Sequence, residues 1–235
     1  MLFLNYWHLF VTGAWVTIWT STVAFAIGLV LGTLFALARR SRFRVLRLIG
    51  TVYVEILRNT PALVQIFIAY FGFASLGFRL PALLAGITAL GVNAGAYLAE
   101  IIRAGIASVP PGQLEAARTL GLSPVQTFFS VVLPQATRTV FPPVVNQYVE
   151  TILGSSLLSA ISVQELTAEA RIVNSITYET LAIFAFAMIF YLILTNLVSF
   201  AAAMFSRSFF KPRIATSYKF SIRGSRQLRT GGGRA

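Results

Sequence analysis

Four long stretches of the chain carry no charged residue, at positions 9–38, 59–78, 80–99 and 180–206. A helix needs roughly 20 apolar residues to cross the hydrocarbon core of a bilayer, which is about 30 Å thick. Each stretch is long enough to do so. The pattern therefore predicts an all-α integral membrane protein, and not a soluble domain.

The breaks between the apolar runs predict five membrane spans, at about residues 12–38, 51–73, 81–102, 139–153 and 180–206. The sequence Asn-Thr-Pro at 59–61 interrupts the second span, and we expect the helix to continue through it with a kink. The fourth span is the least regular, because Pro142, Pro143 and Glu150 interrupt it. The sequence Gly-Ser-Ser at 154–156 then breaks it within or near the membrane.

The interval between the third and fourth spans, residues 104–138, is polar and contains several prolines. No single helix is expected to cross it, because an interior proline removes a backbone hydrogen bond and clashes with the preceding turn. We expect a first short helix over about residues 113–120, where Gly121 provides a C-terminal stop.

A second short helix is expected to follow within the same interval. Ser123 is a suitable N-cap, Pro124 suits the first helical position, and Gln126 can close a capping box. Pro134 is expected to end this second helix before the fourth span begins.

Basic residues determine the expected orientation. The formal net charge is +12, and arginines cluster at positions 39–47, after the first span, and again after the last span. Cytoplasmic flanks of membrane spans are enriched in Lys and Arg. Residues 1–11 are therefore predicted to be a short periplasmic N-terminus, and the polar stretch 163–178 should also lie outside. Residues 207–235 are predicted to form a basic, disordered cytoplasmic tail.

Two other classes of protein fit the composition poorly. A nucleic-acid-binding protein would place its arginines along a binding surface, and would not leave such long uncharged windows. The chain has no cysteine, which excludes a disulfide framework and cysteine-ligated zinc. Its N-terminus has no positive segment before the first apolar run, so we do not expect a cleaved signal peptide.

The functional prediction rests on the spacing of six residues in the polar interval: Glu115, Ala116, Ala117, Gly121, Leu133 and Pro134. This arrangement resembles the EAA loop of ABC importer permeases, which reads E-A-A, three residues, G, nine residues, I, one residue, L-P. Val131 stands in place of the isoleucine. The position is also that of the family, in a cytoplasmic loop just before the penultimate span.

The resemblance implies that the first short helix receives mechanical work from a cytosolic ATPase. Ala116 and Ala117 would permit close approach to a groove, and Glu115 could accept a charge-assisted hydrogen bond from the partner. The alternative is an ordinary amphipathic helix at the membrane surface. That alternative accounts for the alanines but not for the spacing to Leu133 and Pro134.

Two further segments are similar to polar amino acid permeases. Residues 53–61 look like Y-V-E-x-x-R-x-T-P, and residues 96–105 look like A-Y-x-x-E-x-x-R-x-G. The resemblance implies the five-helix transmembrane domain of a type I ABC importer over residues 12–206, in the bacterial inner membrane. It also implies three kinds of partner: a second permease subunit, an ATPase dimer and a periplasmic amino acid binding protein.

The resemblance implies a permease without catalysis of its own. The chain has no phosphate-binding P-loop motif, so we expect ATP and magnesium in the partner ATPase and no cofactor or metal in this chain. A membrane hydrolase built on Ser155, Ser156 and Glu150 is a rival, but the only histidine, His8, lies in the N-terminal segment. A secondary transporter is a second alternative. The chain shows no inverted repeat of the kind found in many secondary transporters, which argues against it.

Polar residues of the third and fourth spans are candidates for the solute path: Glu100, Arg103, Asn146, Gln147, Glu150, Ser155 and Ser156. Polar groups in a membrane usually face a cavity or a partner. For Glu100 and Arg103, mutual pairing on one face of a helix is an equal alternative.

One departure from the family bears on the solute. Polar amino acid permeases often carry a Lys-Asp pair where this chain has Leu153 and Gly154. Such a pair could hold both ends of a zwitterion. Either a partner subunit of a heterodimer holds the solute instead, or Glu150 supplies a negative charge and favours a cationic amino acid.

Overall fold

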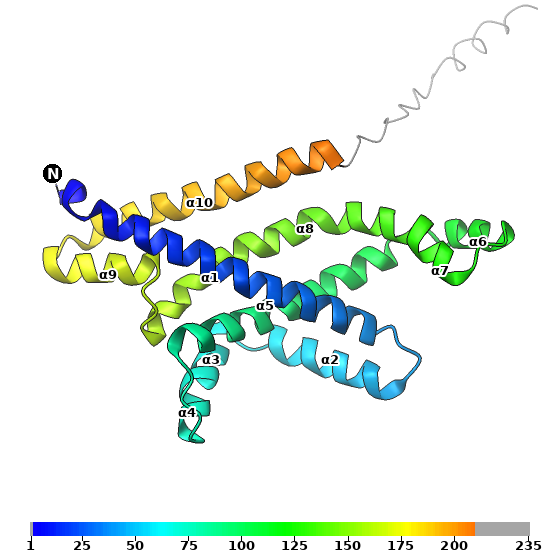
Figure 1. The fold of residues 1–235 in the computed structure, drawn as a ribbon, viewed down its shortest axis with the longest axis horizontal. Helices are drawn as coiled ribbons and strands as arrows, with labels where there is room; N and C mark the ends of the chain where they lie inside the picture. Colours follow the sequence, from blue (N-terminus) through cyan, green and yellow to red (C-terminus); the bar gives the residue numbers. More distant parts are fainter. Residues whose placement is uncertain (1, 210–235) are drawn as a thin grey trace, which may run out of the picture.

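The computed structural model describes residues 2–209, and the predicted disordered tail lies outside this range from residue 210 onward. Every regular element within it is a helix. The long helices α1 (Leu2–Ala38), α5 (Ala82–Ala107), α8 (Leu133–Gly154) and α10 (Thr180–Phe209) run lengthwise in an elongated bundle (Figure 1). The short helix α9 (Leu166–Thr177) lies at the end of the bundle that also holds the N-terminus.

Helix α5 forms the centre of the bundle because small residues let α1 pack closely against it. A Cβ atom on Gly91 would lie 2.8 Å from the carbonyl oxygen of Ala24. A Cβ atom on Gly28 would lie 3.0 Å from the carbonyl oxygen of Gly91. Helices that associate in membranes commonly use small residues in this way, because close backbone approach maximises packing.

Among the three helices with a window apolar enough to span a membrane, α10 has the most hydrophobic window and is the least buried. Only 11% of the most hydrophobic window of α10 is buried, against 61% for α5. Leu181 is 87% exposed and Phe200 is 65% exposed. Such an apolar surface is expected where a protein faces lipid.

Within residues 2–209, three helices are long and apolar enough to cross a membrane, or four if one bent pair counts as a single span. The three are α1, α5 and α10. Helix α8, which contains the predicted fourth span, is not among them. Length and composition therefore support fewer spans than the five predicted.

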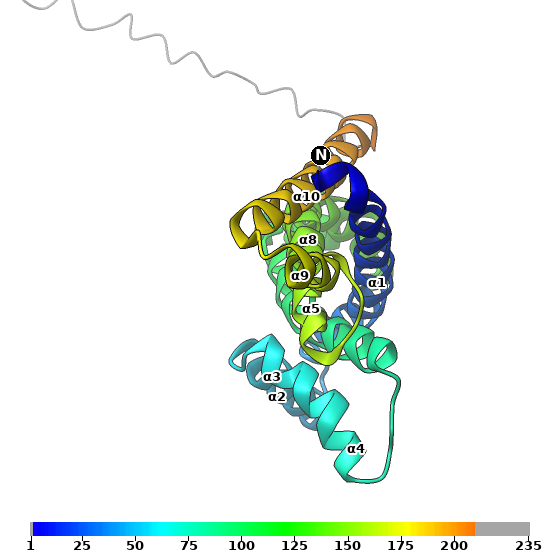
Figure 2. The same ribbon diagram turned by 90° about the vertical axis from the view of Figure 1, so that its left-hand side faces the viewer.

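The predicted second span is broken rather than kinked. Helix α2 (Arg44–Arg58) ends before Pro61, and the chain resumes through α3 (Ala62–Phe67), the π-helical η1 (Ile68–Gly72) and α4 (Phe73–Ser75) at an angle of 107°. Figure 2 shows these helices beside the main bundle. The expectation of a continuous helix was wrong. The physical reason is that the residue before a proline is driven out of the helical conformation.

The polar interval folds largely as predicted at its start. Helix α6 (Pro111–Thr119) is followed by Gly121 with φ 73°, the left-handed conformation of a helix stop. Helix α7 (Pro124–Thr127) begins with Ser123 as its N-cap and a complete capping box with Gln126. Both short helices are confirmed.

The expected helix end at Pro134 was wrong. The π-helical segment η2 (Phe128–Val132) runs directly into α8, and Pro134 occupies the first turn of α8. The π-helical turn immediately before Pro134 changes the hydrogen-bond ladder there, which lets the helix continue past a residue without an N–H. Helix α8 also continues through Pro142 and Pro143. It ends at Gly154, where the predicted break is confirmed and the 3₁₀ helix η3 (Ser155–Ile161) begins.

Candidate functional site

Helix α6 carries the first part of the predicted coupling motif at one end of the bundle (Figure 1). Glu115 and Ala116 are exposed, whereas Ala117 is 3% exposed. Gly121 is also exposed, and a Cβ atom built there would meet nothing within 4 Å. The residues form a short projecting helix with one free side.

The second part of the motif begins α8, beside α6. Leu133 and Pro134 are both exposed. The side-chain amide of Gln135 donates a hydrogen bond to the side-chain oxygen of Gln113 on α6. The two parts of the motif, separated in sequence, are therefore held together at one end of the molecule.

Glu100 and Arg103 form part of an ion cluster that includes a residue from a different helix. Arg39, just after the end of α1, places its Nη1 atom 2.6 Å from Oε2 of Glu100. Arg103 binds the other carboxylate oxygen, Oε1, through Nη2 and Nε. The carboxylate is thus paired on both oxygens within the chain. The sequence allowed two roles for Glu100 and Arg103, which were contact with the solute and pairing with each other. In the structure they pair with each other.

The serines after the break in α8 bond to their own backbone. The hydroxyl of Ser155 is buried and donates to the carbonyl of Ile152 at 2.8 Å. The hydroxyl of Ser156 donates to the carbonyl of Leu153 at 2.7 Å. The rival membrane hydrolase would need one of these two hydroxyls to be activated by a base, whereas both donate to backbone carbonyls.

The remaining candidates lie along α8. Asn146 and Glu150 are exposed, and Gln147 is half-buried. Asn146 lines a groove of about 250 Å³ between α8 and α10, together with Ser199 and Ser206. These amide and carboxylate groups are therefore open to a partner or a solute.

The structure does not gather all the candidate path residues at one level. Gly154, next to Ser155, approaches the side chain of Leu90 on α5. Glu100 lies ten residues further along the same helix, which corresponds to about 15 Å at a rise of about 1.5 Å per residue. The ion cluster and the serines therefore belong to different depths of the bundle.

Two side-chain amides that were not among the predicted functional residues hold the broken second span in place. Gln65 donates from its side-chain nitrogen to the carbonyls of Leu57 at 2.9 Å and Thr60 at 3.2 Å. Asn93 on α5 donates to the side-chain oxygen of Gln65 at 3.0 Å. A carbonyl freed by a helix break needs a new donor. The signal in the sequence is the presence of uncharged amides, Gln65 and Asn93, inside otherwise apolar stretches.

A buried carboxylate anchors α9 to the rest of the bundle at the opposite end. Glu165 caps α9 by accepting from the backbone N–H groups of Thr167 at 2.9 Å and Ala168 at 2.8 Å. It also accepts from the hydroxyl of Tyr191 on α10 at 2.7 Å. Burial raises the pKa of the Glu165 carboxyl, and the hydrogen bonds oppose that shift. Among the described residues, no group of acidic or histidine side chains could hold a metal ion.

Comparison with known proteins identifies the family. A family model described as binding-protein-dependent transport system inner membrane component matches residues 28–211, which is more than half of the chain. This chain belongs to that family. It is a permease of an ABC transporter, and members of this class have no catalytic activity themselves. The ABC system includes separate ATPase subunits, and the family description implies a binding protein.

Curated relatives of the permease are similar over most of their length. The probable glutamine ABC transporter permease protein GlnM of Bacillus subtilis (strain 168) is 39% identical over 195 residues, covering 83% of this chain and 90% of that protein. The L-cystine transport system permease protein TcyB of the same organism is 37% identical, covering 86% and 87%.

Solved structures share the fold of the permease. A chain of an amino acid ABC transporter, crystallised with histidines, matches with a TM-score of 0.83 at 35% identity, covering 87% of this chain and 96% of that one. A chain of the MetNI methionine ABC transporter matches with a TM-score of 0.70 at 23% identity, covering 85% and 95%. The second match supports the fold alone.

Proposed function

We propose that this permease carries a polar amino acid across the bacterial inner membrane, from a periplasmic binding protein to the cytoplasm. The observation that carries the proposal is the exposed helix α6, with Glu115 and Ala116 on its free side and Leu133 and Pro134 beside it. The names of its relatives support the solute class, since they refer to glutamine, cystine and other amino acids.

The proposed topology has five spans, with the N-terminus in the periplasm and the C-terminus in the cytoplasm. In it, α1, the bent pair α2–α4, α5, α8 and α10 each cross once. Helix α8 is more polar than α1, α5 and α10, which suits a span that packs against other protein rather than lipid. The arginines at 39–47 and helix α6 then lie in the cytoplasm, as the positive-inside rule favours.

The proposed coupling role rests on the position of α6. A short helix with small residues on its free side suits insertion into a groove of the ATPase. Glu115 would accept a hydrogen bond from that groove. A movement of the ATPase would reach α8 directly, because η2 and α8 continue from α7 without a break.

Two arrangements of the solute site follow from Leu153 and Gly154, where a charged pair is absent. In the first, which we favour, a second and different permease subunit supplies the charged groups. In the second, two identical subunits contribute Glu150, which is exposed on α8, and the solute is a cationic amino acid. Asn146 and Gln147 would line the path in both.

Reconstitution tests the proposal. The permease is placed in proteoliposomes with its ATPase, its binding protein and any second permease subunit that co-purifies. Uptake of labelled glutamine, cystine, arginine and histidine is then measured with ATP and with a non-hydrolysable analogue. We expect ATP-dependent uptake of at least one of them. Failure to accumulate any of the four with ATP, by a correctly assembled complex, would refute the proposal.

A further inference from the structure

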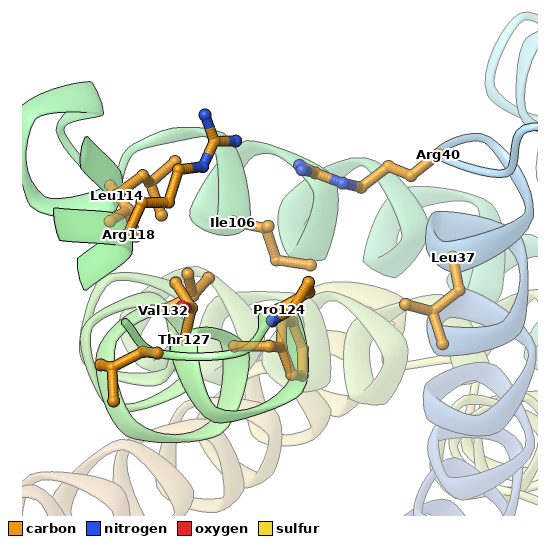
Figure 3. A pocket seen from close by; sticks show the side chains of 11 residues that line it. Leu37, Arg40, Ile106, Leu114, Arg118, Pro124, Thr127 and Val132 are labelled. Carbon is orange, nitrogen blue, oxygen red and sulfur yellow. The ribbon is translucent and has the colours of Figure 1, made fainter. Parts of the chain in front are cut away.

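A cavity of about 570 Å³ lies at the end of the bundle that carries α6. Its walls come from the ends of α1 and α5, from α6, from α7 and from η2. Figure 3 shows these walls around one opening. Five elements of the fold therefore meet around a single space that none of them fills.

The cavity joins an apolar floor to a cationic rim. Leu37, Ile106 and Val132 lie on the floor. Arg40 and Arg118 extend from opposite sides, and their guanidinium groups reach toward one another over Ile106 (Figure 3). A ligand that satisfies both parts must carry a negative charge next to an apolar portion.

Neither arginine has an acidic partner within residues 2–209. The two salt bridges there join Glu100 to Arg39 and to Arg103, and leave Arg40 and Arg118 out. Both arginines are exposed. Two guanidinium groups held near one another without a carboxylate repel each other, and an anion between them relieves the repulsion.

The proposed ATPase contact at Glu115 is next to the cavity on α6 but is not part of its lining. A helix turns about 100° per residue, so the face shared by Leu114 and Arg118 is rotated by about 100° from the face shared by Glu115 and Thr119. Leu114 and Arg118 line the cavity, whereas Glu115 and Thr119 do not. An ATPase that docks through Glu115 therefore need not use the residues that line the cavity.

We propose that this cavity binds the headgroup of an anionic glycerophospholipid, with its phosphate between Arg40 and Arg118 and the start of an acyl chain over Ile106. The location of Arg40 favours a lipid, because it comes two residues after the uncharged run of α1 ends. Basic pockets at the cytoplasmic ends of membrane helices bind anionic headgroups. The site rests on the proposed orientation, in which this end of the bundle faces the cytoplasm.

Such a lipid would connect the end of α1 to the coupling helix through one phosphate. Helix α6 would then be held near its docking position when anionic lipid is present. The permease would thereby respond to the lipid composition of the inner leaflet.

Lipid binding is tested on the purified full-length permease in detergent, without transport. Native mass spectrometry follows titration with phosphatidylglycerol, and separately with phosphatidylcholine of the same acyl chains. Arg40→Gln with Arg118→Gln removes both charge-assisted contacts to the phosphate, so we expect it to weaken phosphatidylglycerol binding about thirtyfold or more. Phosphatidylcholine should bind weakly to the parent and variant alike.

A matched control removes the same charge from the same region. Arg42 and Arg44 are exposed but do not line the cavity. Arg42→Gln with Arg44→Gln should leave phosphatidylglycerol binding within about twofold of the parent, because these residues supply only diffuse attraction. An equal loss in both double variants would overturn the site, since charge alone would then explain the binding.

Two further additions separate the other occupants. Displacement of the lipid by millimolar inorganic phosphate would show a phosphate site and overturn the lipid assignment. Displacement by the saturating ATPase subunit would show a protein interface and overturn it as well. Retention of the lipid in both cases supports the proposal. Because no step needs solute uptake, this result is independent of whether the permease transports an amino acid.

Discussion

Arg39 at the end of α1 donates a hydrogen bond from Nη1 to Oε2 of Glu100 on α5, across 2.6 Å and 61 positions in the sequence. The side chains of Arg39 and Glu100 are 15% and 26% exposed. We expect Glu100→Gln to lower the thermal unfolding midpoint, because Arg39 and Arg103 then face each other without a counter-charge. A hydrogen bond to a charged group contributes about 1.5–3 kcal/mol.

A double-mutant cycle isolates this pair. Arg39→Gln combined with Glu100→Gln should be less destabilised than the sum of the two single variants. The unfolding midpoint of each purified variant in detergent provides the measurement. Strict additivity would mean that the two side chains do not interact, and would return Glu100 to the candidates for a direct solute contact.

The packing of α1 against α5 gives a second prediction. Gly91→Ala would force its new methyl group to within 2.8 Å of the carbonyl oxygen of Ala24, so one helix must move. Overpacking of this kind costs about 1–3 kcal/mol. Gly72→Ala is the matched control, because its methyl group would meet only the side chain of Ile68, at 3.5 Å. Equal yields of monodisperse protein from both variants would contradict the close packing.

The anchor of α9 gives a prediction about pH. Burial raises the pKa of Glu165 above its ordinary value of 4.5, so the folded state holds a proton more firmly than the unfolded state. Stability from this group is therefore full below pH 4.5 and falls as the pH rises through the raised folded pKa. We expect a lower unfolding midpoint at pH 8 than at pH 5.

The variant Glu165→Gln tests whether Glu165 is the group that causes this pH dependence. It should reduce the difference between pH 5 and pH 8, because an amide does not titrate. Glu169, whose pKa is also raised by burial, should supply the remainder. If Glu165→Gln and the parent show the same difference, another group is responsible.

The solute site is tested at Glu150. If identical subunits bind a cationic amino acid through this carboxylate, Glu150→Gln should reduce uptake of arginine about tenfold or more, consistent with the loss of a charge-assisted contact. If the partner subunit of a heterodimer holds the solute, uptake should stay within about twofold of the parent value. Glu179→Gln is the control, since Glu179 is an exposed carboxylate in the turn before α10.

Local chemistry in the sequence predicted the short helices around the motif well. Gly121 and the capping pair of Ser123 and Gln126 act within a few residues, so their effect is readable from spacing alone. The break at Gly154 was predictable for the same reason. In contrast, the sequence did not distinguish the helix break at Pro61 from the tolerated proline at Pro134.

The failures depend on contacts between distant positions. Whether a helix breaks at Pro61 depends on donors such as Gln65 and Asn93, and the bond from Asn93 arrives from another helix. The pairing of Arg39 with Glu100 has no periodic signature, because the two residues meet only after α1 and α5 pack. The cavity between Arg40 and Arg118 has the same origin.

Coupling of the ATPase to this permease through α6 is tested most directly by one isosteric pair of variants at Gly121. Asn tolerates the left-handed conformation that Gly121 adopts, and Asp has the same shape with an added charge. We measure ATP-driven solute uptake in proteoliposomes for Gly121→Asn and Gly121→Asp, with binding-protein affinity as the control. We expect Gly121→Asn to retain most of the uptake and Gly121→Asp to lose it, because a carboxylate in the closed contact is desolvated without a partner. Equal uptake by the two variants would contradict coupling through α6.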